Sequence, residues 1–190
     1  MKKRVFIIHG WGGTPKEAWF PWLEKELEKR NFYVEIPKMP DTENPKINSW
    51  TNYIKKVVGK ADKNTFFVGH SIGCQAIMRY LEKLPEKTKV GGVVFVAGWF
   101  NLMGLEPEEK PIAKPWLETP INFRKIKQHT KKFIAIFSGN DYYVPLSDEK
   151  LFKKRLNAKT IIKNNQGHFD ESENIRKLKV ALDAVLKIAK

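Results

Sequence analysis

The stretch TFFVGHSIGCQAIMRYL, residues 65–81, decides the fold. Its first four residues are β-branched or aromatic, which predicts a buried strand over 65–68. Apolar residues then recur at helical spacing from Ile72 to Leu81, which predicts a helix. Between the two lies Gly69-His70-Ser71-Ile72-Gly73, the G-x-S-x-G pattern of a sharp strand-to-helix turn that exposes its serine. We expect both glycines to be required, because a Cβ at either would clash where the two backbones nearly touch.

Working outward, short apolar strands alternate with amphipathic helices along the chain. Strands are predicted at 2–9, 32–36, 65–68, 90–96, 132–137 and 159–163. Helices are predicted at about 14–30, 49–58, 72–81, 147–156 and 170–188. The expected N-caps of the first, second and last of these helices are Thr14, Ser49 and Asp170. This alternation predicts an α/β fold, in which helices cover both faces of a mostly parallel six-stranded sheet. We expect a single domain over residues 1–190, because no linker or repeat interrupts the pattern.

The alternation breaks at residues 99–131, where four prolines exclude one long helix. We expect an excursion with short helical pieces that contributes to a substrate pocket. Aromatic side chains of this excursion and of the loop after the first strand are candidates for contact with an apolar substrate group: Trp11, Trp99, Phe100 and Trp116.

The net charge is +14, from 35 Lys and Arg against 21 Asp and Glu. The lysines alternate with glutamates along predicted helices, which favours solvated helix faces over binding to nucleic acid or to a membrane. No apolar run is long enough to span a bilayer. Cys74 is the only cysteine, so no internal disulfide is possible, and we expect a reducing, cytoplasmic location.

Serine, aspartate and histidine follow three of the predicted strands. Ser71 follows the third strand, Asp141 the fifth and His168 the sixth. The carboxyl ends of parallel strands meet at one edge of a sheet, and this chain order is that of α/β-hydrolases. We therefore predict that Ser71 is a nucleophile, that His168 is its base and that Asp141 orients the imidazole. Asp170 competes with Asp141, but it already fits as a helix cap, whereas Asp141 has no comparable local role.

The other histidines fit different roles. We expect His9 to hold the loop after the first strand, His70 to pack beside the sharp turn, and His129 to lie at the surface. None is spaced as a paired metal ligand, and neither a metal nor a cofactor is expected. Backbone N–H groups of Trp11 and Ile72 are the candidates for an oxyanion hole. The residues expected to support this site are His9, Gly10, Gly69, His70 and Gly73.

The motifs together resemble those of small serine hydrolases of the retinoblastoma-binding protein 9 / YdeN-like family. The resemblance rests on His9-Gly10-Trp11-Gly12-Gly13, Trp19–Leu23, the G-H-S-I-G turn, the S-G-N-D-x-x-V-P turn at 138–145 and Gly167-His168-Phe169. It implies a compact α/β-hydrolase fold without a large lid. By position, it also implies that Ser71, Asp141 and His168 are the nucleophile, acid and base.

Hydrolysis of small or medium acyl esters is the activity that we expect. A thioesterase, an amidase or a protein-binding member without turnover fits the same residues, so these alternatives stay open. The L-x-C-x-E segment linked to pocket-protein binding is absent around Cys74, so that partner does not carry over. The expected partner is a small acyl substrate, and the sequence leaves open whether there is a protein partner.

Overall fold

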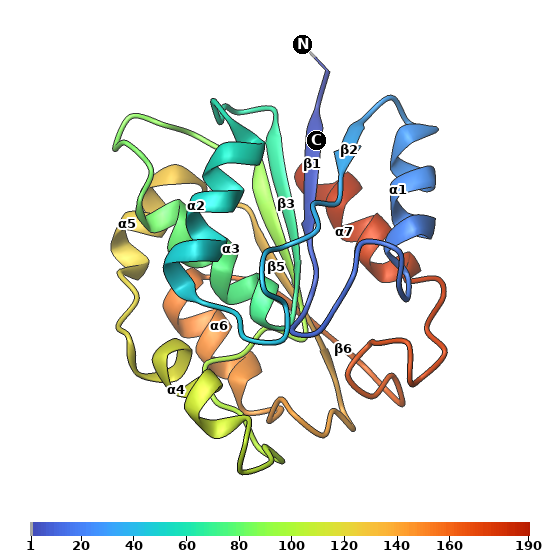
Figure 1. The fold of residues 1–190 in the computed structure, drawn as a ribbon. Helices are drawn as coiled ribbons and strands as arrows, with labels where there is room; N and C mark the ends of the chain where they lie inside the picture. The colour runs from blue at the N-terminus through green and yellow to red at the C-terminus, as the bar shows by residue number, and fades with distance from the viewer. Residues whose placement is uncertain (1) are drawn as a thin grey trace.

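Six parallel strands form one sheet in the computed structural model, which describes residues 2–190 (Figure 1). The strand order is β2-β1-β3-β4-β5-β6, and the predicted α/β class is confirmed. The central strands β3 and β4 are buried along their whole length, as expected for a sheet that is covered on both faces. The strand bounds are Arg4–Ile8 (β1), Tyr33–Glu35 (β2), Thr65–His70 (β3), Gly92–Val96 (β4), Phe133–Ser138 (β5) and Lys159–Lys163 (β6).

Helices lie on both sides of this sheet (Figure 1). One side carries α1 (Phe20–Glu28) and α7 (Lys179–Ile188), which contact each other. The other side carries α2 (Ile47–Val58), α3 (Ile72–Glu82), α5 (Phe123–His129) and α6 (Asp148–Leu156). Within residues 2–190, no helix has the length and apolar character needed to cross a membrane.

The excursion at 99–131 contains two short helices, α4 (Lys110–Glu118) and α5, as predicted. Pro111 lies in the first turn of α4, where its missing N–H costs nothing. Asn122 caps α5 by accepting a hydrogen bond from the Lys125 N–H at 3.1 Å. The excursion therefore forms two short helices rather than one continuous helix.

The prediction of a helix beginning at Thr14 is wrong. The Thr14 hydroxyl accepts a hydrogen bond from the nearby Lys16 N–H, and Ala18 has a positive φ of 47°, which a right-handed helix does not allow. Helix α1 begins only at Phe20 and ends at Glu28. The second helix begins at Ile47, two residues before the predicted cap Ser49.

The final helix also begins later than predicted. Asp170 does not cap it, because one carboxylate oxygen accepts from the Ser172 N–H at 3.0 Å and the other accepts from the Tyr142 hydroxyl at 3.0 Å. These bonds close a turn beside the carboxyl edge of the sheet. Helix α7 begins nine residues further on, at Lys179.

The strand register determines which loops meet. Ile8 pairs with Gly69, His70 pairs with Val96, and Ser138 pairs with Lys163. The loops after β1, β3, β5 and β6 consequently leave the sheet at the same edge. These are the loops that carry the glycine-rich segment, the sharp turn, the candidate acid and the candidate base.

Candidate active site

Ser71 occupies the tip of the sharp turn, between the end of β3 at His70 and the start of α3 at Ile72. Its backbone has φ 51° and ψ −123°, a conformation that residues other than glycine rarely adopt. Such strain persists only where the surrounding structure enforces it, and it gathers at functional sites. Strand β3 runs two residues further than predicted, so a single residue makes the whole turn.

The two flanking glycines are required for the reason that the sequence suggested. A Cβ on Gly69 would lie 2.8 Å from the Cα and N of Cys74, in the first turn of α3. A Cβ on Gly73 would lie 2.3 Å from the carbonyl oxygen of Ile8, on the neighbouring strand. Both contacts are with backbone, which cannot move aside as a flexible side chain can.

We expect Gly73→Ala to destabilise the protein by at least about 2 kcal/mol, because the helix must shift away from β1 to admit the methyl group. The free energy of unfolding, measured with a chemical denaturant, checks this. Gly139→Ala is the matched control, since a Cβ there meets its nearest atom at an ordinary 3.6 Å. Equal stability of the two variants would show that the close approach is not a real constraint.

His168 and Asp141 form the hydrogen-bonded pair that the prediction requires. The Nδ1 of His168 lies 3.0 Å from Oδ1 and 2.9 Å from Oδ2 of Asp141, and both side chains are buried. A carboxylate accepts, so Nδ1 carries the proton and the neutral ring keeps Nε2 as a free acceptor. The Asp141 Oδ1 also accepts from the N–H groups of Tyr143 and Val144, each at 2.9 Å. The expectation that Asp141 has no local role is therefore wrong, and this role fixes the carboxylate in place.

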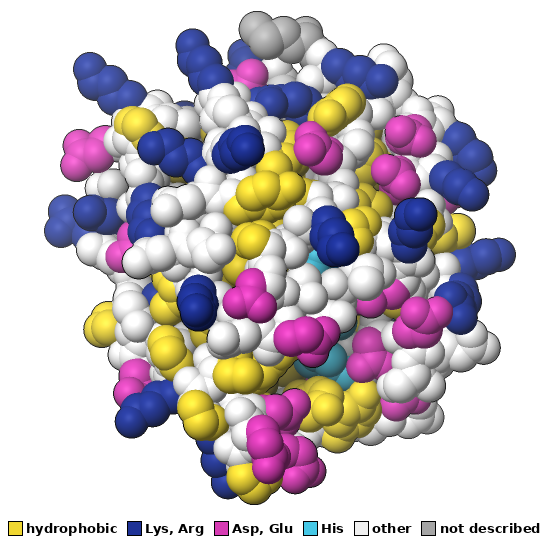
Figure 2. Space-filling view, in the orientation of Figure 1, with side chains coloured by type: hydrophobic (Ala, Val, Ile, Leu, Met, Phe, Trp, Pro, Cys, Tyr) yellow, Lys and Arg dark blue, Asp and Glu magenta, His cyan; other side chains and the backbone are white. Residues whose placement is uncertain are grey.

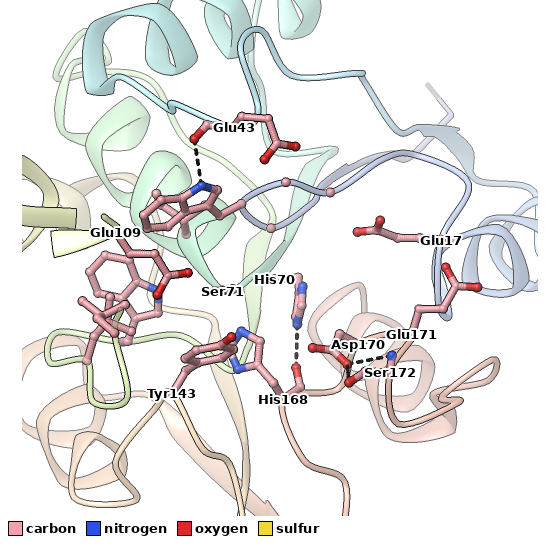
Figure 3. A pocket seen from close by; sticks show the side chains of 18 residues that line it. Glu17, Glu43, His70, Ser71, Glu109, Tyr143, His168, Asp170, Glu171 and Ser172 are labelled. Carbon is pink, nitrogen blue, oxygen red and sulfur yellow. Dashed lines mark hydrogen bonds between the residues drawn. The ribbon is translucent and has the colours of Figure 1, made fainter. Parts of the chain in front are cut away.

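Ser71 and His168 line the same pocket, which has a volume of about 540 Å³ (Figure 3). Within residues 2–190, the Ser71 hydroxyl makes no hydrogen bond to the imidazole. In enzymes without substrate, such bonds are often long and tighten when substrate binds. Further residues of the lining come from the loops after β1, β2, β5 and β6, from the sharp turn and from the excursion: Gly10, Trp11, Gly12, Gly13, Glu17, Glu43, His70, Ile72, Trp99, Leu102, Leu105, Glu109, Tyr143, Asp170, Glu171 and Ser172.

Two backbone donors of this pocket are free. In the described part of the chain, neither the Trp11 N–H nor the Ile72 N–H has a hydrogen-bond partner. Ile72 is the first residue of α3, so its N–H points out of the helix N-terminus, where the helix dipole favours negative charge. Trp11 is held by a bond of 3.0 Å from its indole N–H to the carbonyl oxygen of Glu43. Both donors suit an oxygen that gains negative charge.

The prediction of pocket contact is wrong for two of the four aromatic candidates. Trp11 and Trp99 line the pocket. Phe100 instead packs against Phe152, with ring centres 4.6 Å apart, because Asp148 draws its N–H toward α6. The Trp116 ring is buried, and its indole N–H donates to the carbonyl oxygen of Pro45 at 2.8 Å.

The remaining histidines His9 and His129 lie at opposite edges of the sheet, and only His9 supports a loop of the site. His9 accepts a bond from the Met39 N–H at 3.0 Å and donates to the Gly10 carbonyl at 2.9 Å, so it holds the loop after β1 as expected. His129 is buried, not at the surface, and donates from Nδ1 to the Thr88 carbonyl at 2.8 Å. Its burial follows from packing between distant segments, which spacing along the chain does not show.

His70 packs behind the turn and fastens the loop that carries the candidate base. Its Nε2–H donates to the backbone carbonyl of His168 at 2.8 Å. Burial, and then the neighbouring His168, lower the pKa of His70 from 6.5 to about 4. The ring is therefore neutral at physiological pH.

The lowered pKa of His70 predicts that the folded protein loses stability in acid. Between pH 6.5 and 4, His70 is protonated in the unfolded chain but neutral in the folded protein. The free energy of unfolding therefore falls as the pH falls. At pH 4.5 the loss from His70 is about 2 to 3 kcal/mol relative to pH 7. Burial also lowers the pKa of His9, which adds a loss of the same sign. We expect His70→Gln to lose about 2 kcal/mol less than wild type between these pH values in urea unfolding; equal losses would contradict it.

A parallel sheet that presents a strained serine at the mouth of a pocket is the architecture of the α/β-hydrolases. Solved structures agree with this class. The ydeN gene product of Bacillus subtilis superposes with a TM-score of 0.90 at 29% identity, covering 98% of both chains. Est1E of Butyrivibrio proteoclasticus shares the fold, with a TM-score of 0.74 at 16% identity over 98% of this chain and 88% of Est1E.

The model of the serine hydrolase family matches residues 5–185, and the chain belongs to that family. It is similar to the putative hydrolase YdeN of Bacillus subtilis, with 29% identity over 97% of this chain and 95% of YdeN. It is also similar to the serine hydrolase RBBP9 of Rattus norvegicus, with 27% identity over 90% of this chain and 89% of RBBP9. The predicted family is thus confirmed.

Proposed function

We propose that this serine hydrolase is a carboxylesterase for small or medium acyl esters, in which Ser71, His168 and Asp141 act as a catalytic triad. The observation that carries the proposal is the contact of His168 Nδ1 with both oxygens of Asp141, at 2.9 and 3.0 Å, in the pocket that Ser71 lines. A base that is oriented in this way is what a serine hydroxyl, a weak nucleophile by itself, requires.

In the first half of the reaction, Nε2 of His168 takes the proton of the Ser71 hydroxyl while Oγ bonds to the ester carbonyl carbon. The carbonyl oxygen becomes an oxyanion, which the free N–H groups of Trp11 and Ile72 stabilise. The tetrahedral intermediate then releases the alcohol, which takes the proton from His168. The carboxylate of Asp141 stabilises the imidazolium between these two steps.

In the second half, water replaces the alcohol. His168 takes a proton from the water molecule, whose oxygen attacks the carbonyl carbon of the acyl-enzyme. A second oxyanion occupies the same two N–H groups. The bond to Ser71 Oγ then breaks, Oγ regains the proton from His168, and the carboxylic acid leaves. Apolar side chains on one side of the pocket suit the acyl or alcohol group: Trp11, Trp99, Leu102, Leu105 and Tyr143.

Hydrolysis of a p-nitrophenyl ester series, with acyl chains of increasing length, tests the proposal. We expect turnover with an initial burst of p-nitrophenol, because an acyl-enzyme accumulates when its hydrolysis is the slower half. Matched thioesters and anilides in the same assay distinguish an esterase from a thioesterase or an amidase. A purified, folded protein that neither turns over these substrates nor gives a burst would contradict the proposal.

A further inference from the structure

The indole N–H of Trp99 is a hydrogen-bond donor that the protein itself leaves unused. Trp99 lines the pocket and is 1% exposed. A buried indole N–H usually finds an acceptor, and four other tryptophans donate to backbone carbonyl oxygens at 2.8–3.0 Å: Trp11, Trp19, Trp50 and Trp116. Within residues 2–190, the Trp99 carbonyl accepts a bond from Gln75, but its indole N–H has no acceptor. The pocket wall therefore contains a donor that a ligand can use.

The direction of this donor follows from its accessibility. In the described part of the chain, a small set of side-chain atoms is both fully enclosed and without a partner: Nδ1 of His70, Oε1 of Gln75, Nε of Arg79 and the Tyr80 hydroxyl. Nε1 of Trp99 is not one of them, so this nitrogen still reaches accessible surface. Because Trp99 lines the pocket and almost all of its other surface is covered, the N–H is directed into the pocket.

The backbone is fixed on both sides of this tryptophan. On one side, the side-chain amide of Gln75 in α3 donates to the Trp99 carbonyl at 2.7 Å. On the other side, Asp148 at the start of α6 accepts from the N–H groups of the next two residues. Helix α3 also follows directly on Ser71, so the donor is held at a fixed place relative to the proposed nucleophile. A donor that is positioned in advance loses little entropy when it binds a ligand.

The charge of the pocket determines which kind of acceptor fits this donor. The lining contains five carboxylates and no Lys or Arg: Glu17, Glu43, Glu109, Asp170 and Glu171. Figure 2 shows acidic side chains gathered around the hollow in which histidine is visible. An anionic acceptor, such as a second carboxylate on the substrate, is repelled there. The acceptor that suits Trp99 is therefore a neutral oxygen of an ether, hydroxyl or carbonyl group.

We propose that the indole N–H of Trp99 donates to a second, neutral oxygen of the substrate, so that the enzyme prefers esters with an oxygen in the acyl or alcohol chain over plain alkyl esters. This proposal rests on the proposed function, because it places the ester carbonyl at Ser71. The face of the indole still offers apolar contact, while its N–H edge requires an acceptor. A plain alkyl chain at this place shields the N–H from water without replacing the lost hydrogen bond, which costs binding free energy.

Pairs of esters of equal length test this proposal, each pair differing by an oxygen in place of a methylene. Ethyl 4-methoxybutanoate and ethyl hexanoate vary the acyl chain, and 2-methoxyethyl butanoate and butyl butanoate vary the alcohol. The readout is the ratio of kcat/KM for the oxygen-bearing ester to kcat/KM for the alkyl ester, because intrinsic ester reactivity cancels when this ratio is compared between variants. We expect Trp99→Phe to lower the ratio of one pair about three- to tenfold, the worth of one neutral hydrogen bond.

Trp22→Phe is the matched control. Trp22 is half-buried on α1 and lies outside the pocket lining, so this variant also removes one indole. We expect it to leave both ratios at their wild-type values. Turnover with the same ratios in Trp99→Phe and Trp22→Phe would overturn the contact of Trp99 and leave the esterase proposal intact. An equal fall of kcat/KM for both members of each pair in Trp99→Phe would also overturn it, because a lost donor must affect the oxygen-bearing ester more.

A nuclear magnetic resonance measurement decides the cases in which no ester is hydrolysed or Trp99→Phe does not fold. The indole N–H signals of isotope-labelled Ser71→Ala protein, assigned through the backbone, are followed as each ester is added. We expect the Trp99 signal to move downfield with the oxygen-bearing ester of one pair and less with its alkyl partner, while the Trp22 signal stays in place. This result supports the contact even if the esterase proposal fails. A Trp99 signal that responds equally to both members of each pair, or to none of the esters, overturns it.

Discussion

Ser71→Ala is expected to lower kcat for a p-nitrophenyl ester by about 10⁴- to 10⁶-fold, the range found when a serine nucleophile is removed. The fold should survive, because alanine adds no atoms and the hydroxyl makes no hydrogen bond within residues 2–190. Alanine must still adopt the positive φ of 51° that serine has at this turn. Steady-state kinetics, together with the thermal unfolding midpoint, separates loss of chemistry from loss of structure.

Ser147→Ala is a suitable control for this experiment. Ser147 is exposed at the start of α6, and its side chain makes no capping hydrogen bond. We expect its kcat to equal that of wild type. If Ser71→Ala kept most of the activity, Ser71 could not be the nucleophile, and the proposed acyl-enzyme would be ruled out.

Asp141→Asn is expected to lower kcat by about 10⁴-fold, because it holds His168 in a tautomer that cannot act as the base. The asparagine oxygen can still accept from the N–H groups of Tyr143 and Val144, which keeps the turn closed. Its amide NH₂ then faces Nδ1 of His168 and donates to it. The ring must accordingly carry its proton on Nε2, where it cannot take the proton of Ser71.

Asp170→Asn distinguishes the two candidate acids. Asp170 is two residues from His168 along the chain, but its carboxylate bonds Ser172 and Tyr142 and not the imidazole. We expect a far smaller fall in kcat on a neutral ester than for Asp141→Asn. Kinetics on the two variants, with circular dichroism to verify folding, would refute the assignment if Asp170→Asn proved the more damaging change.

The sheet and the turn at Ser71 were predictable because their causes are local. Alternating short apolar segments indicate a parallel sheet, and the flanking glycines relieve contacts that any side chain would make with backbone. The pairing of Asp141 with His168 was predictable from the sheet, because the strands that precede them are neighbours and end at one edge. These inferences needed only periodicity and one rule of topology.

Features set by distant contacts were not predictable in this way. The start of α7 was missed because Asp170 bonds to Tyr142, which precedes it by 28 residues. The directions of Phe100 and Trp116 depend on Asp148 and Pro45, on other segments.

The catalytic triad that we propose, Ser71, His168 and Asp141, is tested most directly by using mass spectrometry to locate the adduct of a fluorophosphonate probe. We predict one adduct in the wild-type protein, on the peptide that contains Ser71. We further predict that His168→Ala labels far more slowly, because the hydroxyl then has no base. An adduct on another residue, or labelling of Ser71 at an unchanged rate in His168→Ala, would contradict the account.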